Sequence, residues 1–124
     1  MSHASVVIPI YNRKGFLEQA VETVRVQTYE PVECIVVDDG STDGTREHLE
    51  SLDYDALRAV YHNENRGQSV ARNAGIDASS GDYVFFLDSD DILYPHALET
   101  LVSAFEEHGD CAGAFASTKL VKSN

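Results

Sequence analysis

The sequence predicts an α/β fold, a doubly wound and mostly parallel sheet with helices on both of its faces. Short apolar runs alternate with stretches of helical periodicity along the 124 residues. The runs are almost continuously apolar, which is typical of strands that are covered on both faces. Polar or acidic residues follow the runs directly, and the ends of parallel strands are where sheets of this kind bind their ligands.

Five apolar runs are predicted as strands, because β-branched and aromatic residues favour extended backbone. A helical segment separates each run from the next, as the crossover between parallel strands requires. No linker or repeat divides the chain, so we expect residues 1–124 to form a single domain. The predicted strands are Ala4–Ile10, Val32–Asp38, Leu57–Tyr61, Tyr83–Leu87 and Ala112–Ser117.

Four segments between these runs are predicted as helices. In the first, Leu17, Ala20 and Val24 fall on one apolar stripe. Pro95 is placed at the start of the fourth, because a proline in the first turn removes no helical hydrogen bond. The predicted helices are Gly15–Thr28, Gly44–Ser51, Gly67–Ala78 and the segment from Pro95 onward.

The chain is strongly acidic, with 21 acidic residues, 9 basic residues and a net charge of -12. This balance argues against nucleic-acid binding, which needs clustered lysine and arginine to neutralise phosphates. The only lysines are Lys14, Lys119 and Lys122. An acidic, lysine-poor surface suits a salt-adapted (halophilic) protein and an ordinary acidic protein alike, and the composition leaves both open.

Cysteine usage and hydropathy indicate a soluble, cytoplasmic protein. Cys34 and Cys111 lack metal-site spacing, and Cys34 lies in an apolar run, where a buried thiol is expected. No signal peptide precedes the first run, and no run approaches the roughly 20 apolar residues that span a bilayer. We expect any association with the cytoplasmic face of a membrane to require segments outside this chain.

Acidic residues follow two of the predicted strands. Asp38 and Asp39 end the second strand, and Asp88, Asp90 and Asp91 follow the fourth. If these five carboxylates are adjacent, they repel one another unless a cation lies between them. Mg²⁺ or Mn²⁺ would suit such oxygen ligands and could also bridge to a phosphate.

Each group also has a simpler structural interpretation. The residues Asp39–Asp43 could form a turn and a helix cap. Asp88–Asp91 could be a solvated loop, although three acids directly after an apolar strand favour a site. Arg66 and Arg72 could form surface ion pairs. The five histidines show no metal-ligand spacing, and we interpret all of them as structural or surface residues.

Taken in order, these segments resemble the family 2 glycosyltransferases, which have the Rossmann-like nucleotide-diphospho-sugar transferase fold. A single DxD motif is weak evidence, but the whole series on alternating strands and helices is specific. The resemblance covers roughly Val6 to Leu101. The matching stretches are Val6–Asn12, Gln27–Tyr29, Ile35–Thr45, Asn65–Gly67, Ala71–Ile76 and Gly81–Asp91.

The resemblance implies a role for each of several residues. Tyr11 would pack on the nucleobase, Asp39 would accept a hydrogen bond from it, and Asp88 would hold the ribose. Gly67 and Gly75 would allow close backbone approach. It thus assigns metal binding to Asp90, with Mn²⁺ or Mg²⁺ as the ion, and nucleotide binding to Pro9, Tyr11, Asn12, Asp39, Arg72 and Asp88.

The implied activity is metal-dependent, inverting transfer of a sugar from a nucleotide-diphospho-sugar, with UDP favoured, to a hydroxyl of a sugar, lipid or protein acceptor. Members of the family continue beyond the matched region. We therefore expect residues 1–124 to be the N-terminal part of a longer glycosyltransferase domain, truncated before the general base. On this interpretation the chain alone has little or no activity and self-associates through an open sheet edge.

Three alternatives come from other classes. A phospho-acceptor receiver domain has paired acids and a late lysine, here Lys119, but needs acids after its first strand, which ends in Tyr11-Asn12. A sugar-nucleotide pyrophosphorylase needs a glycine-rich basic loop at that point, and Asn12–Gly15 matches it poorly. A non-catalytic nucleotide-binding module stays open.

Overall fold

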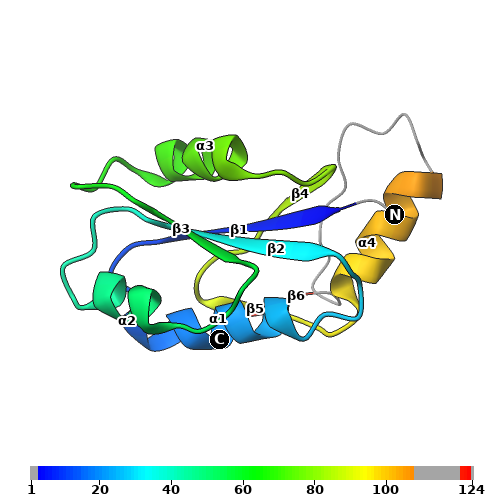
Figure 1. Ribbon diagram of the computed structural model, residues 1–124, viewed down its shortest axis with the longest axis horizontal. Coiled ribbons are helices and arrows are strands. Elements are labelled where there is room, and N and C mark those ends of the chain that lie inside the picture. The colour runs from blue at the N-terminus through cyan, green and yellow to red at the C-terminus, as the bar shows by residue number, and fades with distance from the viewer. Residues whose placement is uncertain (1–2, 108–120, 124) are drawn as a thin grey trace.

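The computed structural model describes residues 3–107 and 121–123, and its centre is a parallel four-stranded sheet (Figure 1). The strands lie in the order β3-β2-β1-β4, so the strand order reverses between β1 and β4. The doubly wound α/β fold predicted from the sequence is confirmed. The strands are β1 (Ala4–Ile10), β2 (Val32–Asp38), β3 (Leu57–Tyr61) and β4 (Tyr83–Phe86).

Helices cover both faces of the sheet (Figure 1). The helix α3 (Gln68–Ala78) lies on one face, and α1 (Lys14–Arg25) and α2 (Thr45–Ser51) lie on the other. The fourth helix, α4 (Ala97–Glu107), follows the sheet and packs its first turn into the core on the α1 side. Among the described residues, no helix combines the length and apolarity needed to cross a bilayer.

The two central strands are buried on both faces, which explains their continuous apolar sequences. Alternate residues of β1 point to opposite sides, so Val6 and Ile8 pack toward α1. Val7 packs toward α3, together with Ile35 and Val37 of β2. The edge strand β3 is different, since its residues are exposed or only half buried.

Helix α3 approaches the sheet closely because small residues face it. A Cβ atom added to Gly75 would lie 2.2 Å from Cγ1 of Val7 in the centre of β1. Ala71, one turn earlier, is also buried against the sheet. Gly67, which precedes the helix, has open space around it, and its φ of +98° explains the glycine.

A second, two-stranded sheet was not predicted. In it β5 (Asp91–Leu93) pairs antiparallel with β6 (Val121–Ser123). Strands of three residues carry too few side chains to show a period, and these two are far apart in the sequence. The predicted strand Ala112–Ser117 lies outside the described residues.

The predicted last residues of α2 and α3, Ser51 and Ala78, agree with the structure, and the other predicted helix ends differ by one to three residues. Helix α1 ends at Arg25 instead of Thr28, and α4 begins at Ala97 instead of Pro95. The two differences have one cause, because Gln27 and Thr28 leave the helical path and hydrogen-bond to the residues before and in the first turn of α4. The strand β4 also ends one residue earlier than predicted, at Phe86.

Candidate functional site

A cavity of about 460 Å³ opens at the carboxyl ends of the strands, where the strand order reverses between β1 and β4. This is the place at which open α/β sheets bind ligands, since the loops after neighbouring strands diverge there. Five of the seven residues predicted to bind nucleotide or metal line this cavity. They are Pro9, Tyr11, Asp39, Asp88 and Asp90.

Asp39 is almost fully buried and accepts three hydrogen bonds from its own chain. Its Oδ1 accepts from His62 Nδ1 at 2.9 Å and from the Arg66 amide at 3.0 Å, and its Oδ2 accepts from the Gly67 amide at 2.9 Å. Burial by itself would raise the pKa of Asp39, but these hydrogen bonds outweigh it and lower the pKa. The side chain therefore stays anionic and holds the loop before α3 against the end of β2.

His62 supports the site through its contact with Asp39, a role that was not predicted, and this structural role agrees with the interpretation given to the histidines. It is the first residue after β3, and Tyr61 of β3 pairs with Asp38 of β2. That register places His62 beside Asp39, so its ring orients the carboxylate. The only signal in the sequence is its position at a strand end, which a single histidine shares with many surface residues.

Asn12 does not line the cavity, contrary to the expectation from the resemblance. Its φ of 52° places it in the left-handed region, and its Oδ1 accepts a hydrogen bond from the Thr42 amide at 2.7 Å. Its own amide donates to Ser41 Oγ at 2.9 Å. Asn12 thus ties the loop after β1 to the loop after β2, and this link supports the neighbouring Tyr11, whose side chain is 43% exposed.

The five carboxylates at the ends of β2 and β4 do not form one cluster. Asp38 is buried, and its Oδ1 accepts from the Ser41 amide at 3.0 Å, which stabilises the turn after β2. Asp39 is held by its own donors. Asp88, Asp90 and Asp91 do gather, with one oxygen of each within 4.8 Å of the others. We call these three residues the acidic cluster.

The acidic cluster has the donor chemistry that a divalent cation requires. Three carboxylates offer hard oxygen ligands, and the turn keeps them together through a hydrogen bond from the Asp91 amide to the Asp88 carbonyl at 3.0 Å. Arg72 Nη2 lies 3.7 Å from Asp88 Oδ1, which offsets one of the three charges. The residues present therefore fit Mg²⁺ or Mn²⁺.

Arg72 lies beside the cavity and is not one of the residues that line it. Its Nε is buried and has no hydrogen-bond partner within the described part of the chain. Its guanidinium carbon lies 5.8 Å from the centre of the Phe86 ring. A buried donor without a partner costs free energy, so this guanidinium has unused capacity to bind an anion.

Four further polar residues line the cavity and were not predicted as site residues: Arg13, Asn65, Gln68 and Ser89. Arg13 precedes α1, and Gln68 is the first residue of α3. Arg13 and Gln68 add a cationic group and the amino-terminal end of a helix, whose free N–H groups favour anions. The cavity therefore combines an exposed aromatic ring, an anionic acceptor, anion-binding groups and the acidic cluster.

The chain is similar to known proteins in both sequence and fold. The sequence profile of the family described as Glycosyl transferase family 2 matches residues 5–122. An uncharacterized glycosyltransferase of Rickettsia bellii is 42% identical over 104 residues, which cover 84% of this chain and 15% of that protein. Glycosyltransferase GlyG of Streptococcus pneumoniae is 42% identical over 105 residues, which cover 83% of this chain and 35% of that protein.

Solved structures show the same fold. S. aureus TarS in complex with UDP-GlcNAc superposes with a TM-score of 0.78 and 28% identity, over 88% of this chain and 32% of that one. The mannosyltransferase PcManGT of Pyrobaculum calidifontis, in complex with GDP-Man and Mn²⁺, superposes with a TM-score of 0.74 and 29% identity, over 82% and 32%. The chain thus spans about a third or less of the length of these proteins.

Proposed function

Since this chain belongs to glycosyl transferase family 2, we propose that it forms the donor site of an enzyme that transfers a sugar from a UDP-sugar to an acceptor hydroxyl group. The observation that carries this proposal is the convergence of Tyr11, Asp39, Asp88 and Asp90, from three strand ends, on one cavity. Membership of this family also argues against the receiver-domain and pyrophosphorylase alternatives.

We assign the nucleoside to the part of the cavity between Tyr11 and Asp39. The exposed Tyr11 ring offers a face on which a base can stack. Asp39 Oδ2 accepts one hydrogen bond within the chain, so it retains capacity for a second donor such as uracil N3–H. The backbone hydrogen bonds that fix Asp39 mean that this acceptor is already oriented before the nucleotide arrives.

We assign the diphosphate to the part of the cavity beside the acidic cluster. Asp88, Asp90 and Asp91 would hold a divalent cation, which would offset the negative charge that develops on the departing nucleoside diphosphate. The Arg72 guanidinium, whose Nη2 lies 3.7 Å from Asp88 Oδ1, and the start of α3 would contribute donors to the phosphate oxygens. These roles are supported by the binding of GDP-Man and Mn²⁺ to PcManGT.

The reaction is an inverting displacement in this proposal. The acceptor oxygen forms a bond to the anomeric carbon while the bond from that carbon to the diphosphate oxygen breaks. A general base takes the proton of the acceptor hydroxyl, and we assign this base to none of the described residues.

Calorimetry tests the proposal directly, with UDP, GDP and dTDP titrated into the chain with and without Mn²⁺ or Mg²⁺. We expect UDP to bind most tightly and to bind more weakly without the metal. Asp90→Ala should remove the metal-dependent part of the affinity, whereas Asp39→Ala should weaken binding of uridine itself. Asp53→Ala, an exposed aspartate in the loop before β3, is the matched control and should change neither.

Two results would contradict the proposal. Equal affinity for UDP with and without metal would remove the cation from the donor site. Unchanged uridine binding by Asp39→Ala would remove the nucleobase contact.

A further inference from the structure

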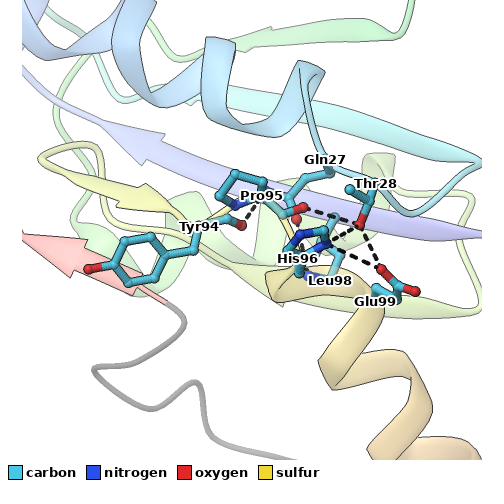
Figure 2. A network of polar contacts seen from close by, with 7 residues as sticks. All are labelled: Gln27, Thr28, Tyr94, Pro95, His96, Leu98 and Glu99. Atoms are coloured by element: carbon cyan, nitrogen blue, oxygen red, sulfur yellow. Dashed lines mark hydrogen bonds and ion pairs between the residues drawn. The ribbon is translucent and has the colours of Figure 1, made fainter.

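A network of hydrogen bonds, buried at Leu98 and exposed at Thr28, joins the end of α1 to the segment that follows the acidic cluster (Figure 2). At its centre is Gln27, which is only 8% exposed and lies just after α1. Figure 2 shows its side chain among backbone groups that come from the turn between β5 and α4. Gln27 belongs to the stretch Gln27–Tyr29, to which the donor site described above gives no role.

The side-chain amide of Gln27 makes three hydrogen bonds, which join α1 to the segment that starts α4. Its Nε2 donates to the Thr23 carbonyl at 2.9 Å and to the Tyr94 carbonyl at 2.8 Å. Its Oε1 accepts from the Leu98 amide at 3.1 Å. Because the Leu98 amide is in the first turn of α4, it has no partner within the helix, and Gln27 caps the helix from 71 residues away.

Two neighbouring residues, Thr23 in α1 and Thr28 just after it, strengthen the same contact. Thr23 Oγ1 accepts a hydrogen bond from the Leu93 amide at 3.3 Å. Thr28 donates to the Pro95 carbonyl from its amide at 3.0 Å and from its hydroxyl at 3.3 Å. We call Thr23 and Gln27 the clamp. Thr28 is left out of it because this residue is exposed to solvent.

The acidic cluster lies between the clamp and a second anchor. On the upstream side, the Leu87 amide donates to the Val7 carbonyl at 3.0 Å, which attaches the chain to β1. On the downstream side, the clamp holds Leu93 and Tyr94. The turn that carries the three carboxylates therefore lies between two attached ends, the second of which also pairs with β6. A shift of the clamped end would move the backbone that carries Asp90 and Asp91.

We infer that Gln27 is a positioning residue that sets the geometry of the acidic cluster for its cation. The inference rests on the metal site of the proposed function. Mg²⁺ and ions of similar size accept oxygen ligands only within a narrow range of distances and angles. Among the described residues, the Gln27 side chain hydrogen-bonds to backbone groups and to no carboxylate, so it acts on the ion through the backbone of β5 and the turn before α4.

A simpler reading makes Gln27 only a stabiliser of α4, and the two readings differ in a measurable way. A stabiliser changes the free energy of unfolding and leaves metal affinity of the folded chain unchanged. A positioning residue changes metal affinity at temperatures where each variant is fully folded.

The experiment measures the Mn²⁺ dissociation constant of the chain by electron paramagnetic resonance, together with thermal unfolding. Gln27→Met removes all three hydrogen bonds while keeping the side-chain length. Gln27→Glu keeps the acceptor for the Leu98 amide and loses both donors. The control is Glu33→Gln, which weakens another buried polar network, with Ser5 and Ser80, near the opposite end of the sheet.

We expect Gln27→Met to weaken Mn²⁺ binding by about tenfold, the lower end of the effect of residues that support metal ligands. Gln27→Glu should weaken Mn²⁺ binding at least as much as Gln27→Met, because its buried carboxylate would face the Thr23 and Tyr94 carbonyl oxygens and repel them. Glu33→Gln should lower the unfolding temperature and change the dissociation constant less than about twofold, a margin well below that supporting effect.

Unchanged Mn²⁺ affinity in folded Gln27→Met would overturn the inference and leave the metal site standing. Equal weakening by Glu33→Gln would also overturn it, because the effect would then follow stability alone. Absence of Mn²⁺ binding by the natural protein would overturn the metal site and the inference together.

Discussion

Replacing Gly75 with alanine tests whether the close packing of α3 on the sheet sets the wall of the cavity. The added methyl group would lie 2.2 Å from Cγ1 and 3.1 Å from Cγ2 of Val7. Val7 is fully buried in the middle of β1, and its backbone pairs with Ile35 of β2. Its side chain therefore has no room to move aside. The helix must therefore shift away from the sheet.

Two opposing effects set the size of the change. Alanine is favoured over glycine inside a helix by about 1 kcal/mol. Inserting a methyl group into a closely packed interior costs about 1–3 kcal/mol, and a contact as short as 2.2 Å belongs at the upper end of that range. We expect Gly75→Ala to lower the free energy of unfolding by about 2 kcal/mol.

Urea unfolding followed by circular dichroism measures this difference. Gly15→Ala is the matched control, because a Cβ atom at Gly15 in α1 meets nothing within 4 Å, and it should stabilise the chain by about 0.5 kcal/mol. Adding Val7→Ala removes the methyl groups in conflict. The double variant should then be more stable, by about 1 kcal/mol, than the sum of the two single effects predicts.

The displacement should also reach the cavity, since Gln68 and Ala71 of α3 line it. We expect UDP to bind more weakly to Gly75→Ala than to Gly15→Ala. A Gly75→Ala chain as stable as the natural protein would refute the reasoning, because α3 would then have room that the packing denies it.

Two further predictions concern buried ionisable groups. Burial alone would raise the pKa of Glu33, but hydrogen bonds from Ser80 and Ser5 outweigh it and lower the pKa. The lowered pKa stabilises the fold at pH values above the ordinary glutamate pKa of about 4.3, and this stabilisation is lost as the pH falls through the lowered pKa. Acid should therefore unfold the natural protein more steeply than Glu33→Gln. Parallel acid-unfolding curves would contradict this. Burial raises the pKa of the Cys34 thiol to about 12. In a Cys111→Ser background, iodoacetamide should therefore label Cys34 only when the chain unfolds. Rapid labelling of the folded chain at pH 8 would count against the burial of Cys34.

The strands were largely predictable from local sequence. The predicted bounds of Ala4–Ile10, Val32–Asp38 and Leu57–Tyr61 agree with the structure at every residue. Runs of β-branched residues favour extended backbone, and the residues after them change abruptly to turn formers. The helices were predictable in number for the described chain and less so at their ends, because capping groups come from elsewhere in the fold.

The cavity could be located from the strand ends, because every parallel strand delivers its last residues to the same edge of the sheet. Tyr11, Asp39, Asp88 and Asp90 do meet at this edge, whereas Asn12 lies outside the cavity lining and ties two loops together. A strand end does not bring every residue to the ligand side, because adjacent residues point in opposite directions. After β2, Asp39 lines the cavity, whereas Asp38 accepts a hydrogen bond from the Ser41 amide. The roles assigned to the site residues remain predictions.

Hydrophobic periods and turn residues act over a few positions, so they can be read along the chain and they specify which segments become strands and helices. The partner of a buried polar group has no such period. His62 meets Asp39 across 23 residues, and Gln27 meets Leu98 across 71, because strand order and register bring those segments together. Such contacts depend on the packing of the whole chain, which is why the orientation of Asp39 and the attachment of the acidic cluster were visible only in the folded molecule.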